Sequence, residues 1–242
     1  MPQPGLHGIL ALATRKAFSK ARGFATGLAF GSMLPDMDAY PQAFAFLVLG
    51  MDSGAAYRAC HRTFTHTLFV PLALAIVVYA LSTKASLRRL RAPGLGIAVG
   101  MALLHDVPDI VGWFHRVDIL WPVWSLDLWG GARLPERAIS LFRASNFLSL
   151  ALYFTCLFWL AKRTRTSEAY RPRLRRHALA QLTIGLFLCL VAFLAPAGTY
   201  NVVDGALYLS VGLPAAFGVT WRMRDTIEGG LGTTAIESGG PS

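Results

Sequence analysis

Long apolar segments separated by short polar connections dominate the chain. Five of these segments carry few charged residues, and their lengths approach the roughly 20 residues that a membrane-spanning helix needs. They cover residues 66–82, 93–114, 146–161, 177–194 and 206–221. We therefore expect an all-α protein, a polytopic helical bundle embedded in a membrane with about five spans.

Two shorter apolar helices precede these spans. Apolar residues recur at helical spacing over 5–18, and a second apolar stretch over 24–34 is ended by Pro35. Neither is long enough to cross a bilayer alone. If the two form a hairpin, the start of the first helix meets the end of the second. We therefore expect His7 to lie near Asp36.

Three other stretches complete the organisation of the chain. Residues 41–51 form a further short apolar piece. Residues 119–130 hold three tryptophans, a residue that favours the membrane–water interface. Residues 225–242 are rich in Gly, Ser and Thr, which is typical of disordered tails. We expect one membrane-embedded domain over 1–224 and a disordered tail over 225–242.

Composition supports a membrane protein. Charged residues make up 15% of the 242 residues, against about 25% in soluble domains, and the mean hydropathy is +0.47. A net charge of +10 would also suit a nucleic-acid-binding protein. The Lys and Arg residues, however, cluster in short loops beside the apolar segments, as the positive-inside rule describes, and such loops attract anionic lipid. We expect membrane lipid, and no nucleic acid, as the partner.

One pair of polar residues interrupts the apolar segment 93–114. His105 and Asp109 are four residues apart, so on a helix both side chains share a face and can clamp one metal ion. Pro108 between them weakens a regular helix. A simple helical His–Asp pair is the alternative, but ionisable residues inside membrane segments are costly and usually functional.

Two carboxylates follow the short N-terminal helices. Asp36 and Asp38 come directly after Pro35. Alternate residues of an extended turn face the same way, so both carboxylates can reach one site or bridge two metals. An acidic surface turn is the alternative. We expect Asp36 to be a metal ligand and Asp38 to act as a general base, a bridging ligand or a residue that orients the ligands.

Two histidines precede the first span. His61 and His66 are five residues apart, too far for one face of a straight helix. If Thr63 or Thr65 caps a helix that begins near residue 65, both imidazoles can bend toward one point. Arg62 lies between them and can hold an anionic oxygen, for example of a phosphate, or contact lipid headgroups.

These residues together predict a divalent metal site, since imidazoles and carboxylates are the ligands that zinc and similar ions take. We assign the catalytic roles to Asp38 and Arg62. The predicted metal ligands are His7, Asp36, His61, His66, His105 and Asp109.

The basic loops orient the predicted bundle. Residues 84–91 carry four positive charges, residues 162–176 carry seven, and Arg222 and Arg224 follow the last span. If these lie in the cytoplasm, the five spans alternate without conflict and the metal ligands gather on the other side. The basic residues within 15–22 belong in the cytoplasm by the same rule, but the short hairpin reaches only part of the way there.

The order of these motifs resembles a known family. An N-terminal His7 is followed by Leu-Pro-Asp-x-Asp at 34–38, His-Arg-x-x-Thr-His at 61–66 and His-x-x-x-Asp at 105–109. The chain is similar, over roughly residues 5–125, to the LexA-regulated, membrane-bound, predicted metal-dependent hydrolases of bacteria. It departs from their pattern at Thr67, where a Ser usually follows, and at Pro108. That family is distantly similar to zinc-dependent phospholipases C, and this similarity implies phosphoester hydrolysis.

We therefore expect a metal-dependent hydrolase of the bacterial inner membrane that uses a divalent metal, zinc above all, on a lipid-like or phosphoester substrate. The sequence has no GxSxG, P-loop, GxGxxG or HExxH motif, so it does not support the standard hydrolase and nucleotide-binding classes. Two alternatives remain open. One is a proton- or ion-coupled transporter that uses intramembrane His and Asp, and the other is a non-catalytic protein that a metal stabilises.

Overall fold

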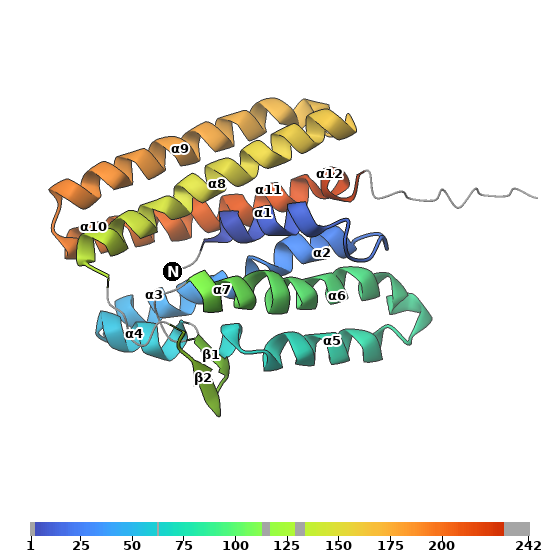
Figure 1. Ribbon diagram of the computed structural model, residues 1–242, viewed down its shortest axis with the longest axis horizontal. Helices are drawn as coiled ribbons and strands as arrows, with labels where there is room; N and C mark the ends of the chain where they lie inside the picture. The colour runs from blue at the N-terminus through green and yellow to red at the C-terminus, as the bar shows by residue number, and fades with distance from the viewer. Residues whose placement is uncertain (1–2, 62, 113–116, 129–133, 230–242) are drawn as a thin grey trace, which may run out of the picture.

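The computed structural model describes residues 3–61, 63–112, 117–128 and 134–229, and they form an all-α helical bundle, as expected (Figure 1). By length and composition, four continuous helical stretches of these described residues can cross a membrane. The longest helix, Glu136–Thr164, has 29 residues and is therefore about 43 Å long, against a hydrocarbon core of about 30 Å. The four stretches are Ala85–Gly112, Glu136–Thr164, Glu168–Leu194 and Ala197–Arg222.

The N-terminal half is built from short helices and one small hairpin. Three of its segments, η1, η2 and η3, are 3-10 helices, and η4 is a π-helical turn that continues α6. The elements are α1 (Pro4–Thr14), α2 (Phe24–Gly31), η1 (Leu34–Asp38), α3 (Ala39–Leu47), α4 (Ser53–Cys60), η2 (Phe64–His66), α5 (Phe69–Leu81), η3 (Ala85–Leu90), α6 (Arg91–Val99), η4 (Gly100–Asp106), α7 (Val107–Gly112), β1 (Val117–Leu120) and β2 (Trp124–Leu126).

The C-terminal half is made of long helices that cover α1 and α2. The helices α8 and α9 pack side by side along their length (Figure 1), and a π-helical turn, η6, links α10 to α11. The elements are α8 (Glu136–Thr164), η5 (Glu168–Tyr170), α9 (Arg171–Leu194), α10 (Ala197–Leu207), η6 (Tyr208–Gly212), α11 (Leu213–Arg222) and α12 (Arg224–Glu228).

The predicted span 66–82 is shorter than expected. Its helix, α5, has 13 residues and is therefore about 20 Å long, so within the described ranges four helical stretches rather than five have the length to cross a bilayer. The reason lies in His61 and residues 63–68, which are not α-helical. Thr67 is extended, and its hydroxyl donates to the carbonyl oxygen of Ile119 in β1. The segment that would lengthen the helix is instead attached to the hairpin.

Two boundary expectations also change. The segment 119–130 contributes to the β1–β2 hairpin as far as Leu126, and its last two residues lie outside the described ranges. The predicted tail 225–242 is folded at its start, since α12 reaches Glu228 and buries Thr226 and Ile227. Packing of α12 against α2 and α8 stabilises this segment, although the Gly-rich composition of residues 225–242 predicted disorder.

Close helix contacts hold α2 against α6 and η4. Gly31 lies against the backbone of Ile97, and Gly100 lies against the backbone at Leu28. A Cβ atom at either glycine would overlap these backbone atoms, so only glycine allows the approach. Small residues at a crossing are typical of membrane helices. This crossing fixes Ser32, just after α2, beside His105 in η4.

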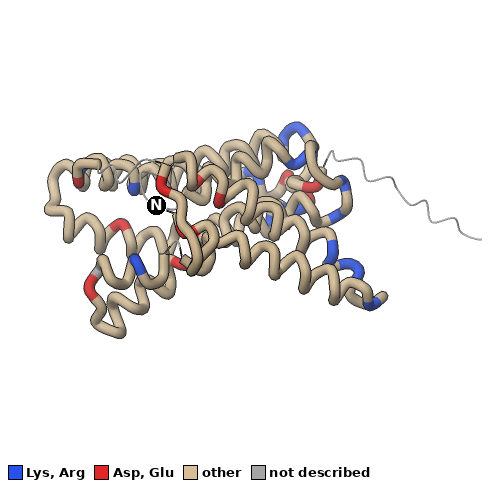
Figure 2. The backbone as a smooth tube through the Cα atoms, turned by 60° about the horizontal axis from the view of Figure 1, so that its bottom comes forward, with Lys and Arg blue, Asp and Glu red and all other residues tan. Residues whose placement is uncertain are grey.

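Charge is distributed unevenly along the bundle. The connections α1–α2, α5–α6 and α8–α9 and the α12 end all lie at one end of the molecule (Figure 1), where Figure 2 shows most of the Lys and Arg residues. The basic residues within 15–22 therefore lie at the same end as the other basic loops, as the positive-inside rule predicts. The short hairpin was expected to reach only part of the way to that end.

Large apolar side chains cover much of the bundle surface. On α5 and α9 they include Ile76 at 61% exposed and Leu194 at 75%. Such a surface is unusual for a soluble monomer but suits contact with lipid tails.

Candidate metal centre

Six elements bring the predicted ligands together inside the bundle. Asp36 and Asp38 come from η1, which Pro35 initiates. The remaining side chains are His7 on α1, His61 at the end of α4, His66 in η2, His105 in η4 and Asp109 on α7. All seven side chains are buried, with at most 4% of any residue exposed. Arg62, the other predicted catalytic residue, lies outside the described residues.

Two groups of donor atoms share His105. His7, Asp36 and His105 form one group, and His66, His105 and Asp109 form the other. Within each group, one ligand atom per residue lies within 4.8 Å of the others. The hairpin argument is confirmed, because α1 and α2 do place His7 beside Asp36. Five of the six predicted ligands therefore meet in one buried centre.

The hydrogen bonds of three histidines fix which ring nitrogen faces the centre. His7 Nδ1 donates to the carbonyl oxygen of Leu104 at 2.9 Å, and His105 Nδ1 donates to that of Ser32 at 2.9 Å. Because a carbonyl oxygen only accepts, both Nδ1 atoms carry the proton. In the neutral rings, Nε2 then holds a lone pair, as in metal-binding histidines whose other nitrogen is held by an oxygen.

His66 is oriented by a hydroxyl and a carboxylate. The Thr65 hydroxyl donates to Asp38 Oδ2 at 2.9 Å, so its oxygen accepts from His66 Nδ1 at 3.0 Å. His66 Nδ1 also lies 3.3 Å from Asp38 Oδ2. The proton of His66 is thereby placed on Nδ1, and Nε2 faces the centre. Thr65 is not the helix cap that its sequence position predicts.

Asp38 lies behind the histidines rather than among the ligands. One oxygen accepts from His61 Nδ1 at 2.6 Å, and the other accepts from Thr65. Burial alone would raise the pKa of the Asp38 carboxyl from 3.8, but the charges and hydrogen bonds of His61 and His66 outweigh burial and lower this pKa. Asp38 therefore stays ionised at neutral pH. Of the three predicted roles, the geometry favours the residue that orients the ligands.

His61 lies at the edge of the centre. Its ring centroid is 5.4 Å from that of His66, and it belongs to neither group of donor atoms found among the described residues. Its Nδ1 is directed to Asp38, and its ring borders a cavity between α3 and the C-terminal helices. Among the described residues, His61 therefore lies outside both groups, and its role as a ligand stays a prediction.

The donor separations fit a divalent ion. Tetrahedral zinc with bonds of about 2.0–2.2 Å separates its donor atoms by roughly 3.3–3.6 Å. His66 Nε2 lies 3.0 Å from His105 Nε2 and 3.6 Å from Asp109 Oδ2. His105 Nε2 lies 3.9 Å from Asp109 Oδ2 and 4.0 Å from Asp36 Oδ1, and His7 Nε2 lies 3.3 Å from Asp109 Oδ1. Five donors in two overlapping groups can hold one ion or two.

The sequence analysis missed several residues near this centre. Asp106 is fully buried beside His105, and within the described ranges its carboxylate makes no hydrogen bond. The same signal that selected His105, a charge inside an apolar segment, was available for it. The C-terminal helices also bury Asn146, Asp204 and Tyr208.

Comparison with known protein families gives one match. Residues 4–200 match the family described as YdjM inner membrane protein. The matched range includes every candidate ligand and most of the long helices. No curated protein and no solved structure matches the chain. The match confirms the expected membrane-bound bacterial family, and because it spans most of the chain, the protein belongs to the YdjM inner membrane protein family.

Proposed function

We propose that this inner membrane protein is a metal-dependent hydrolase that cleaves a phosphoester bond in a lipid-like substrate. Three things support the proposal: the buried His/Asp centre, its place in a multi-helix membrane protein, and the resemblance of its motifs to predicted metal-dependent hydrolases. Zinc is the preferred ion, because the donor set consists of imidazoles and carboxylates.

One observation carries the proposal. The Nε2 atoms of His66 and His105 face each other at 3.0 Å, while both Nδ1 atoms are donors to oxygen. Two lone pairs at that separation repel unless a proton or a metal ion lies with them. The same holds for His7 Nε2 and Asp109 Oδ1 at 3.3 Å. A divalent cation satisfies both pairs and compensates buried negative charge.

In this proposal, each residue of the centre has a distinct role. His7, Asp36, His66, His105 and Asp109 would hold the metal, which lowers the pKa of bound water to about 7 and polarises the scissile group. Asp38 positions His66 and His61. Since His61 carries its proton on Nδ1, the neutral ring has its lone pair on Nε2 and suits proton transfer at the cavity wall. We therefore assign proton transfer to His61 rather than to Asp38.

The test is hydrolysis by detergent-purified protein loaded with zinc. The substrates are bis(p-nitrophenyl) phosphate and phospholipid vesicles, and products are followed by absorbance and by mass spectrometry. We expect turnover by the wild type and at least a hundred-fold loss in His105→Gln. His177→Gln serves as the control, since His177 lies on α9 against Phe154 and Tyr170, outside the centre.

Two results would contradict the proposal in different ways. Stoichiometric metal with no turnover of either substrate would favour the non-catalytic, metal-stabilised protein. Turnover that survives both His105→Gln and chelation would place any hydrolysis elsewhere.

A further inference from the structure

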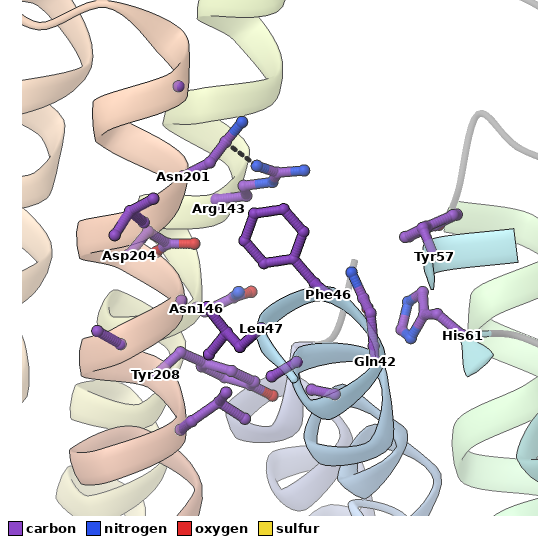
Figure 3. Close-up of a pocket in the computed structure, with 17 residues that line it drawn as sticks. Gln42, Phe46, Leu47, Tyr57, His61, Arg143, Asn146, Asn201, Asp204 and Tyr208 are labelled. Carbon is purple, nitrogen blue, oxygen red and sulfur yellow. Dashed lines mark hydrogen bonds between the residues drawn. The ribbon is translucent and has the colours of Figure 1, made fainter. Parts of the chain in front are cut away.

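A cavity of about 390 Å³ adjoins the candidate metal centre (Figure 3). Gln42, Phe46 and Leu47 of α3 lie on one side of it, and α8 and α10 form the other. His61 also lines it, so the cavity and the centre share a residue. The volume is within the range of small-molecule sites. It is large enough for a lipid headgroup and the first carbons of its chains, but not for a whole lipid.

Three buried polar side chains line this cavity and have atoms without a hydrogen-bond partner. They are Asn146 at 2% exposed, Asp204 at 7% and Tyr208 at 4%. Among the residues that the structure describes, nothing bonds to Asn146 Oδ1, Asp204 Oδ1 or Tyr208 Oη. Buried polar atoms are nearly always hydrogen-bonded in folded proteins. Three exceptions around one cavity therefore indicate a ligand that bonds to them.

The chemistry of these atoms describes the ligand. Asp204 Oδ1 and Asn146 Oδ1 accept hydrogen bonds, so the ligand must bring donors. The Tyr208 hydroxyl can donate, and Arg143 supplies a cation whose Nη1 is held by Asn201 Oδ1. A guanidinium is well suited to phosphate. The cavity therefore suits a phosphate that is attached to a group bearing N–H or O–H donors.

The cavity rim indicates a lipid rather than a soluble phosphoester. Phe46 and Leu47 line the cavity and are 42% and 73% exposed, and Val202 on the opposite wall is 62% exposed. Phe44 and Leu49 extend this apolar surface along α3 and just beyond it. Acyl chains that leave the cavity would lie against these side chains.

We propose that this cavity binds the headgroup of a phospholipid that carries hydrogen-bond donors beyond its phosphate, with Arg143 contacting the phosphate and Asp204 and Asn146 accepting from the headgroup. This inference rests on the proposed function, because it assigns the cavity as the substrate site of that centre. His61 lines the cavity and donates to Asp38, and so links the cavity to the centre.

The test is native mass spectrometry of the detergent-purified full chain with defined lipids, with and without a chelator. Phosphatidylethanolamine and phosphatidylglycerol supply ammonium and hydroxyl donors, respectively. Phosphatidylcholine has the phosphate without donors, and diacylglycerol has a hydroxyl donor without the phosphate. We expect phosphatidylethanolamine or phosphatidylglycerol to bind at least about ten-fold more tightly than the last two. Whichever of the two binds more tightly identifies the donor.

Variants then assign the contacts. Arg143→Gln should weaken binding about ten-fold, and Asp204→Asn should reduce the preference over phosphatidylcholine. Ala43→Leu should reduce binding by filling the cavity. Arg137→Gln is the matched control, because Arg137 is exposed on the same helix outside the cavity. Equal binding of all four lipids by the wild type would overturn the inference even if every variant misfolded.

The two proposals fail separately. If the protein still selects between headgroups after chelation but hydrolyses neither substrate, the lipid site is supported and the hydrolase function is contradicted. Hydrolysis of bis(p-nitrophenyl) phosphate by a protein that binds all four lipids equally would support the metal centre and contradict the lipid site. The same conclusion would follow if hydrolysis occurred and Arg143→Gln bound lipid as tightly as the wild type.

Discussion

His105 and Ser32 are joined by a hydrogen bond of 2.9 Å from the imidazole Nδ1 to the backbone carbonyl oxygen, across 73 residues of sequence. The bond places one histidine of a membrane-spanning segment against the end of a short N-terminal helix. It also turns His105 Nε2 toward His66, Asp36 and Asp109. The centre therefore depends on the packing of α2 against η4 as much as on the ligands themselves.

The first prediction concerns that packing. Gly31→Val should reduce metal content and lower the melting temperature, because its side chain would push α2 from the backbone of Ile97 and break the His105–Ser32 geometry. The control is Gly218→Ala on α11, where a Cβ meets no atom within 4 Å. That change should be neutral or slightly stabilising. Thermal unfolding and metal analysis on the same samples check both, and a Gly31→Val protein with normal metal content would argue against the coupling.

The second prediction concerns Asp38. Asp38→Asn should weaken metal binding about 10- to 100-fold without abolishing it, because Asp38 orients ligands instead of binding the ion. Competition with a chromogenic chelator measures the affinity. Asp225→Asn, at an exposed position of α12, should behave as the wild type. A complete loss of metal in Asp38→Asn would instead make Asp38 a ligand, as one of the three predicted roles had it.

The third prediction concerns Thr65. Thr65→Val should weaken metal binding by a smaller factor than Asp38→Asn, because it removes one hydroxyl that accepts from His66 and donates to Asp38. Thr63→Val is the matched control, since the Thr63 hydroxyl bonds only weakly, at 3.4 Å, to the Ala59 carbonyl oxygen. Equal affinities of the two variants would show that the Thr65 hydroxyl does not orient His66.

The fourth prediction concerns metal removal. An ion present at 100 to 1,000 times its dissociation constant stabilises the fold by about 3–4 kcal/mol, and for a chain of this size that corresponds to roughly 5–15 °C in melting temperature. Chelation should lower the melting temperature of the wild type by this amount and leave His105→Gln unchanged. The same shift in both proteins would mean that the chelator acts elsewhere.

The fifth prediction concerns orientation in the membrane. In a variant without Cys60, Cys156 and Cys189, a cysteine at Ser86 near the basic α5–α6 connection should react with a membrane-impermeant maleimide only from the cytoplasmic side. A cysteine at Asp52, which caps α4 near the centre, should react from the opposite side. Labelling of intact cells and of inverted vesicles distinguishes the two, and reaction of both positions from one side would contradict the proposed orientation.

Much of the centre follows from local sequence patterns, because its ligands come from a few short motifs. The spacing of His105 and Asp109 predicted that they share one group of donors, the turn after Pro35 predicted the place of Asp36, and the hairpin of two short helices predicted that of His7. These inferences use geometry that one or two elements impose. They do not need the rest of the fold.

The remaining features depend on contacts between distant segments. Thr65 was expected to cap a helix, but Asp38, 27 residues earlier, draws its hydroxyl into the centre. The span 66–82 is shortened because Thr67 bonds to Ile119. Asp204 and Tyr208 line a cavity with α3 only through the packing of the whole bundle. These contacts join segments far apart in the chain, so neither hydrophobic periodicity nor residue spacing could predict them.

The most direct test of the central claim is the metal content of detergent-purified protein by mass spectrometry, comparing the wild type with His105→Ala and Asp36→Ala. The account predicts one or two divalent ions per wild-type chain and the loss of at least one in each variant, since both residues belong to the same group of donors. A wild-type protein that holds no metal even after reconstitution, or variants that keep the full wild-type content, would contradict it.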